Sequence, residues 1–123
     1  MALTKNTSFA NPLGTILVTQ TASSATADTN VTGTTSVLNV LEVTNGSNAT
    51  SYTKIWDSLS PQVGTDAPVL SFPVAAGATR TLNLMGAGWT ATTGISMATV
   101  TSGATSGSTS PTGGDVKVSL ICT

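Results

Sequence analysis

The chain has 123 residues, of which only 7% are charged and 4% are aromatic, and its formal net charge is −1. It contains no histidine, which excludes catalysis by a histidine base and metal binding through histidine. One cysteine cannot form a disulfide framework, and four basic residues are too few to follow a phosphate backbone, so nucleic acid is not an expected partner.

Residues 1–12 are mostly small and polar with one lysine, and they lack the apolar stretch of a secretory signal peptide. We expect them to form an extended N-terminal arm. Residues 13–123 have the length of one domain with a single core. The longest apolar runs are far shorter than a bilayer-spanning segment, so a membrane is not an expected partner either.

The remaining residues favour strands over helices. Ser and Thr account for 40 residues, and no window repeats apolar residues at helical spacing. Strands are predicted at residues 13–20, 36–44, 50–57, 69–74, 79–85, 94–101 and 115–122. Short strands separated by Gly, Pro and Asn are typical of sandwiches and barrels. The predicted fold class is all-β: a single antiparallel β-sandwich, jelly-roll or immunoglobulin-like, with about seven strands and the arm.

The second predicted strand carries apolar side chains on both faces. Strict alternation places Val37, Leu41 and Val43 on one face and Leu38 and Val40 on the other. Because both faces then need cover, we expect this strand to lie in the middle of a sheet.

The next two predicted strands contain further positional signals. Tyr52 and Trp56 share one face, opposite the face of Ile55. Pro73 cannot donate a hydrogen bond to a ladder, so its strand is expected to lie at an edge or to end at Phe72.

Three long loops separate the predicted strands, at residues 21–35, 58–68 and 102–114. The first and third consist almost wholly of Ser, Thr, Ala and Gly. Such loops carry little apolar area to offset their ordering entropy. If they are ordered, we expect a partner outside the domain to order them.

The acidic residues are the remaining candidates for chemistry: Asp28, Glu42, Asp57, Asp66 and Asp115. The last three stand at turns, where a carboxylate accepts hydrogen bonds from nearby backbone, and this structural interpretation is favoured. The alternative is a weak Ca²⁺ site formed by Asp57, Asp66 and loop carbonyls. Without histidine, serine catalysis would need a Ser–Lys pair. We therefore expect neither a metal or other cofactor nor an enzymatic activity.

The aromatic residues Tyr52, Trp56 and Trp89 suggest an alternative, a platform on which a sugar ring stacks. Against this, Trp56 lies on a predicted strand and is interpreted as a core residue. Trp89 stands between small residues, where an indole either plugs the end of a sandwich or contacts a partner.

A longer pattern extends over the second half of the chain. It consists of Tyr52-Thr53-Lys54-Ile55-Trp56-Asp57, Pro-Gln-Val-Gly-Thr-Asp-Ala-Pro-Val-Leu at 61–70, Pro-Val-Ala-Ala-Gly at 73–77, Gly-Ile-Ser at 94–96 and Gly-Gly-Asp-Val-Lys-Val-Ser-Leu at 113–120. The order and spacing of these pieces resemble those of small β-sandwich virion proteins of tailed bacteriophages. The first half of the chain has no counterpart in this pattern.

The resemblance implies a structural role on a virus particle, and it carries over no catalytic residues. The leading hypothesis is a capsid decoration (cement) protein, made in the host cytoplasm and located on the capsid surface of the virion. Its partners would be the major capsid protein and copies of itself, as a trimer or other homo-oligomer. The expected interaction residues are Phe9, Pro12, Leu13 and Trp89. The alternatives are a tail or head-fibre component attached to another virion protein, and a carbohydrate-binding module.

Overall fold

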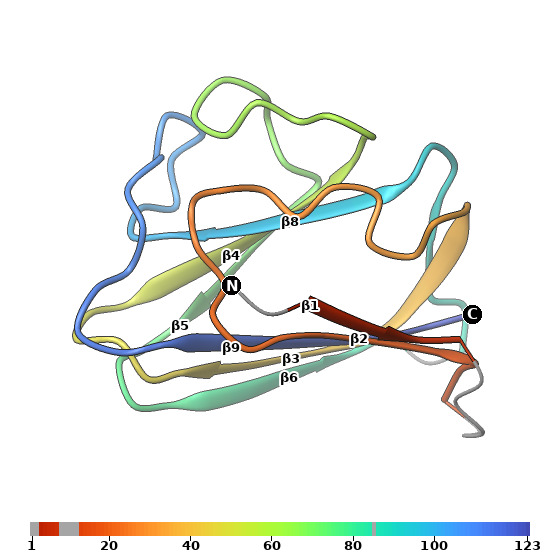
Figure 1. Ribbon diagram of the computed structural model, residues 1–123, viewed down its shortest axis with the longest axis horizontal. Coiled ribbons are helices and arrows are strands. Elements are labelled where there is room, and N and C mark those ends of the chain that lie inside the picture. The colour runs from red at the N-terminus through yellow and green to blue at the C-terminus, as the bar shows by residue number, and fades with distance from the viewer. Residues whose placement is uncertain (1–2, 8–12, 85) are drawn as a thin grey trace.

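The computed structural model describes residues 3–7, 13–84 and 86–123. Within these residues the chain forms nine β-strands and no helix, hence no helix that could cross a membrane. The strands are β1 (Leu3–Asn6), β2 (Ile16–Gln20), β3 (Ser36–Asn45), β4 (Ser51–Asp57), β5 (Leu70–Val74), β6 (Thr79–Asn83), β7 (Trp89–Ala91), β8 (Ile95–Val100) and β9 (Val116–Cys122). They form two antiparallel sheets that face each other as a β-sandwich, so the predicted fold class is confirmed (Figure 1).

The larger sheet contains six strands. Five follow the order β1-β2-β9-β3-β6, and β7 pairs with the first part of β3. The smaller sheet has three strands in the order β5-β4-β8. In Figure 1 the smaller sheet lies above the larger one.

The main core fills the space between the two sheets. Along β9 the alternation predicted from the sequence holds, because Val116, Val118 and Leu120 are buried while Lys117 is exposed. Ile95 and Met97 of β8 meet them from the smaller sheet. Burying a side chain of this size contributes about 1.5–3 kcal/mol, so this two-sided apolar layer holds the sheets together.

A β-bulge in β3 changes which of its side chains face the core. The pairing of β3 with β9 shifts between Leu38 and Val40. Leu38 therefore joins Leu41 and Val43 in the core, although strict alternation places it on the other face. The predicted grouping of Val37 with the core residues is wrong. The central position of the strand is confirmed, because β9 and β6 flank it.

Two short strands, β1 and β7, are missing from the sequence prediction. β1 lies within the residues expected to form the arm, and it pairs with β2 at one edge of the larger sheet. β7 has three residues and begins at Trp89. Neither segment has an apolar alternation long enough to predict a strand.

The loop between β2 and β3 lies along the edge of β8, where Figure 1 shows it in orange. Asp28 and Met97 exchange two backbone hydrogen bonds of 2.8 and 2.9 Å, and the Val31 N–H donates to the Ile95 carbonyl at 2.8 Å. The loop thus closes this edge of the smaller sheet. The expectation that a partner outside the domain must order it is wrong, because β8 supplies its partners.

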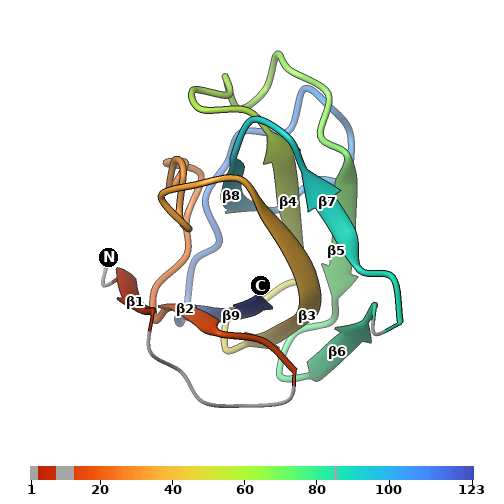
Figure 2. The same ribbon diagram turned by 90° about the vertical axis from the view of Figure 1, so that its right-hand side faces the viewer.

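The other two long loops, residues 58–68 and 102–114, cover the outer face of the smaller sheet (Figure 2). The indole N–H of Trp56 donates to the Asp66 carbonyl at 3.0 Å. A Cβ atom on Gly103 would lie only 2.9 Å from the Tyr52 ring, so glycine is needed for this close approach. Trp56 is buried, as predicted, but beneath a loop and outside the core between the sheets.

Candidate binding site

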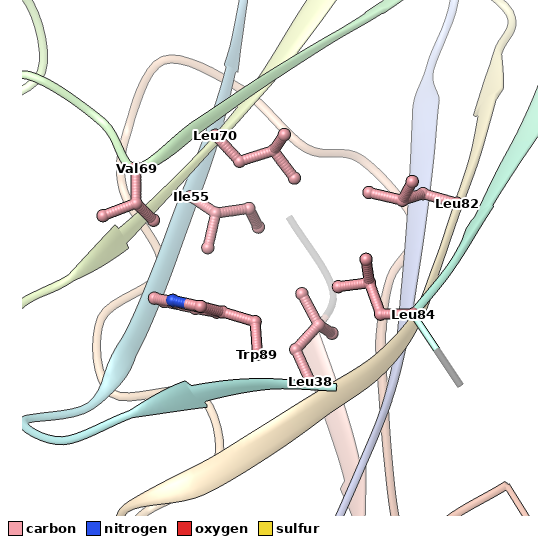
Figure 3. Close-up of a pocket in the computed structure, with 7 residues that line it drawn as sticks. All are labelled: Leu38, Ile55, Val69, Leu70, Leu82, Leu84 and Trp89. Carbon is pink, nitrogen blue, oxygen red and sulfur yellow. The ribbon is translucent and has the colours of Figure 1, made fainter. Parts of the chain in front are cut away.

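An apolar pocket opens on the side of the sandwich where β5 faces β6 and β7 (Figure 3). Its volume is about 190 Å³. Seven side chains line it: Leu38, Ile55, Val69, Leu70, Leu82, Leu84 and Trp89. Among these seven, only Trp89 carries a polar atom, its indole nitrogen. The pocket therefore offers shape and apolar contact, and it offers neither acid nor base.

Both sheets contribute to this pocket, and local sequence explains how. Leu82 and Leu84 are two residues apart at the end of β6, so they lie on the same side of the chain. The bulge in β3 turns Leu38 inward, and Ile55 approaches from β4. Ile55 is fully buried, whereas Val69 is 57% exposed. The pocket thus leads from solvent at Val69 to the edge of the main core.

The edge of β5 beside the pocket is poorly suited to strand addition. Pro73 lacks an N–H group and lies in this edge strand, which confirms the prediction for it. Arg80 of β6 donates from Nη1 to the Pro73 carbonyl at 2.6 Å, and its guanidinium lies 4.6 Å from the centre of the Phe72 ring. A partner would therefore engage this side with a side chain rather than with a paired strand.

Asp57, at the end of β4, holds the turn between β7 and β8. Its carboxylate accepts hydrogen bonds from the backbone N–H groups of Thr92, Thr93 and Gly94 at 3.0, 2.8 and 3.1 Å, and from the Thr92 hydroxyl at 3.1 Å. The donors on Gly94, Thr93 and Thr92 lower the pKa of Asp57 to about 2. This carboxylate caps a turn, which is the role that the sequence favours.

Two further acids also serve local structure. Asp66 accepts a hydrogen bond from the Gln62 N–H within its own loop at 2.9 Å. Asp28 is buried and accepts one from the Gln20 side chain at 2.9 Å. In the part of the chain that the structure describes, no three His, Cys, Asp or Glu side chains gather as metal ligands. The hydrogen bonds of Asp57 and Asp66 support turn chemistry over the alternative Ca²⁺ site.

Lys54 is fully buried beneath the loop at 102–114. Its ammonium donates to the carbonyl oxygens of Ala104 and Gly107, at 2.5 and 3.4 Å. Burial lowers the pKa of Lys54. Ser71 stands opposite Lys54 in the pairing of β4 with β5, and its buried hydroxyl has no partner among the described residues. The Lys54 nitrogen is directed to these two carbonyls and makes no hydrogen bond with the Ser71 hydroxyl, so the structure does not place it as a base for this serine.

The four interaction residues predicted from the sequence have different outcomes. Phe9 and Pro12 lie outside the described residues. Leu13 is half-buried, and its carbonyl accepts a hydrogen bond from the Asn39 side chain at 2.8 Å, but it does not line the pocket. Trp89 is half-buried and lines the pocket. The other six lining residues escaped sequence analysis, because each one has the features of an ordinary core residue.

The three aromatic residues considered for sugar stacking do not form one platform. Trp56 is 3% exposed and is covered by the loop at 58–68. Tyr52 lies against Gly103 on the same outer face of the smaller sheet. Trp89 lies elsewhere, in the pocket beside β6. The structure therefore offers no aromatic surface built from these residues together.

Comparison of the chain with protein-family models, with curated proteins and with solved structures finds no match.

Proposed function

We propose that the chain is a structural protein of a phage virion that decorates the outside of the assembled capsid, and that its pocket receives an apolar side chain of a capsid subunit. The observation that carries this proposal is the pocket itself. Its volume of about 190 Å³ is below the roughly 300–1,000 Å³ of typical small-molecule sites. It suits a single side chain of the size of Leu or Phe. The resemblance of residues 52–120 to phage virion proteins is the reason for proposing a phage capsid as the particle.

The chemistry of the pocket favours docking over catalysis. A reaction needs a nucleophile, an acid or base, or a bound metal placed at the substrate. The lining side chains supply none of these groups. A partner side chain that enters the pocket exchanges water for apolar contact on nearly every side, as at the centre of a protein–protein interface.

Decoration stabilises a capsid by mass action. A protein that binds the assembled shell and not its free subunits contributes about 2.7 kcal/mol per site when its free concentration is about a hundredfold above Kd. Many copies add such contributions over one shell. The small number of charged residues suits this role, because few charges lose their hydration in the interface.

The first test is the protein composition of purified particles from cells that express this chain. A decoration protein is expected in hundreds of copies per particle. A tail or head-fibre component, the second candidate, is expected in about three to twelve copies, in keeping with the symmetry of a tail or vertex. Absence of the chain from particles would overturn the proposal.

The second test asks whether the pocket makes the contact. Leu84→Glu places a charge in the pocket, and Thr90→Glu places the same charge on an exposed residue of β7 as a matched control. Capsids stripped of this chain should sediment with the wild type and with Thr90→Glu, and not with Leu84→Glu. Equal binding of both variants, with both shown to be folded by circular dichroism, would exclude the pocket as the contact.

A further inference from the structure

The two sheets differ in how their outer faces are covered. Two loops lie over the smaller sheet, whereas the described loops leave most of the underside of the larger sheet uncovered in Figure 1. The described chain approaches that side at Gly14, where a Cβ atom would lie 3.0 Å from the Ile121 side chain. We call the side of the larger sheet that faces away from the smaller sheet the open face. It carries Leu17, Val40, Glu42, Lys117, Ser119 and Ile121.

Strand register orders these side chains into rows across the open face. Leu17 pairs with Ile121, and Ile121 pairs with Val40, so three half-buried aliphatic side chains stand side by side. Ser119 pairs with Glu42 in the next row. The face is thus an aliphatic strip flanked by exposed polar residues, which is the composition of a modest protein interface.

The two charged side chains of the open face have opposite signs. Glu42 is exposed on β3 and accepts a hydrogen bond from the Thr81 hydroxyl at 3.2 Å. Lys117 is exposed on β9, two residues along that strand from the partner of Glu42. Asp115 precedes β9 and stands at the rim, where its carbonyl accepts a hydrogen bond from the Gly46 N–H at 2.9 Å.

A surface with one charge of each sign is complementary to itself under two-fold rotation. When two copies stack with a two-fold axis midway between these charges, each Glu42 lies opposite Lys117 of the other copy. A two-fold contact of this kind uses the same patch on both copies, and complementary charges select the partner and the register.

We propose that the open face binds a second copy of this chain, with Glu42 of each copy paired with Lys117 of the other. The size of the face limits the strength of the contact. Five strands about 4.8 Å apart span roughly 20 Å across the sheet. A square patch of the roughly 800 Å² that each partner contributes to a standard interface is about 28 Å wide. The dimer is therefore weak, and crowding many copies onto one surface favours it. This proposal does not depend on the pocket or on the proposed virion role.

The test uses two charge reversals, Glu42→Lys and Lys117→Glu, in the full chain. Each variant alone faces two like-charge contacts, so its dimer dissociation constant should rise about tenfold. In an equimolar mixture, the lysine introduced by Glu42→Lys meets the glutamate introduced by Lys117→Glu. The unchanged Lys117 of the first variant meets the unchanged Glu42 of the second. The mixture should form a heterodimer with near wild-type affinity, which sedimentation velocity with one labelled variant measures.

A matched control carries the same charge change elsewhere. Lys5 pairs with Val18, a core residue, and so points to the other side of β1. Lys5→Glu should leave dimerisation unchanged. Three results would each overturn the proposal: a wild type that stays monomeric at the highest soluble concentration, single reversals that dimerise like the wild type, or a mixture that gains nothing over its components.

Discussion

The ammonium of Lys54 lies 2.5 Å from the carbonyl oxygen of Ala104, fifty residues further along the chain. This contact joins the middle of β4 to the loop at 102–114, which contains no large apolar residue of its own. A lysine stem and its charged end therefore take the place that apolar side chains have elsewhere in the fold: they attach a segment to the sheet.

Lys54→Met should distinguish the effect of the aliphatic stem of Lys54 from the effect of its ammonium group. The substitution conserves volume, so we expect the free energy of unfolding to change by less than about 1.5 kcal/mol. The loop loses its hydrogen-bond donor and should be cut faster by a broad-specificity protease under native conditions. Lys54→Ala also empties buried space and should cost about 2–5 kcal/mol. Equal cleavage of Lys54→Met and wild type would show that the ammonium does not anchor the loop.

The pKa of Asp57 predicts how stability depends on acidity. It is about 2 in the folded chain against an ordinary value of 3.8. Because the pKa is lower in the folded chain, the unfolded chain takes up a proton at higher pH than the folded chain does. The contribution of Asp57 to the free energy of unfolding is therefore fully present above pH 3.8 and is lost as the pH falls toward 2. Asp57→Asn should unfold at lower urea concentration than wild type at neutral pH, and the two midpoints should converge as the pH falls through that range. A constant difference across the range would contradict this assignment.

The thiol of Cys122 should be unreactive in the folded protein. It is fully buried at the end of β9, and burial raises the pKa of its thiol to about 12. Because the thiolate is the reactive form, a disulfide reagent at mildly alkaline pH should modify the thiol only after denaturant is added. Thr79→Cys adds an exposed thiol on β6 as a positive control, and one equivalent should then react at once. Rapid reaction of the wild type would mean that β9 opens readily.

Asn45 should be one of the most sensitive polar positions. It is fully buried, and its side-chain amide donates to the carbonyls of Ala49 and Val74, both at 2.8 Å. Its side-chain oxygen accepts from the N–H and hydroxyl of Ser47 at 2.9 and 2.6 Å. Asn45→Ala leaves several of these groups unpaired and should lower the free energy of unfolding by about 2–5 kcal/mol.

The control for Asn45 is its neighbour Asn48, whose side chain is exposed. Asn48→Ala should change the free energy of unfolding by no more than about 0.5 kcal/mol. Urea titration measures both variants. Similar losses for the two would show that the amide network is not what stabilises this corner.

Sequence alone predicts most of the strands because alternation is a local signal. Each of the seven predicted strands overlaps a strand of the structure, with ends that differ by up to three residues. β1 escapes prediction because its state depends on pairing with β2, and its four residues are all exposed. Position on a face is also predictable where a strand is regular, as for Tyr52 and Trp56.

The pocket is beyond sequence analysis for two physical reasons. Its lining comes from residues 38 to 89, and only the packing of two sheets brings them together. One of them, Leu38, faces inward because of a β-bulge that the local sequence pattern does not predict. Trp89 alone stands out in the sequence, as a large side chain among Gly and Ala.

The place of β9 sets the order in which this protein can fold. Its residues, Val116–Cys122, follow the other eight strands along the described chain, yet they bridge β2 and β3 in the middle of the larger sheet. Until they arrive, those two strands expose their edges, because their shared neighbour lies more than seventy residues downstream. Strand pairs between segments so far apart in the sequence form slowly. The larger sheet can therefore be completed only after residues 116–122 have been made, whereas the pairing of β3 with β6 and the whole smaller sheet do not need them.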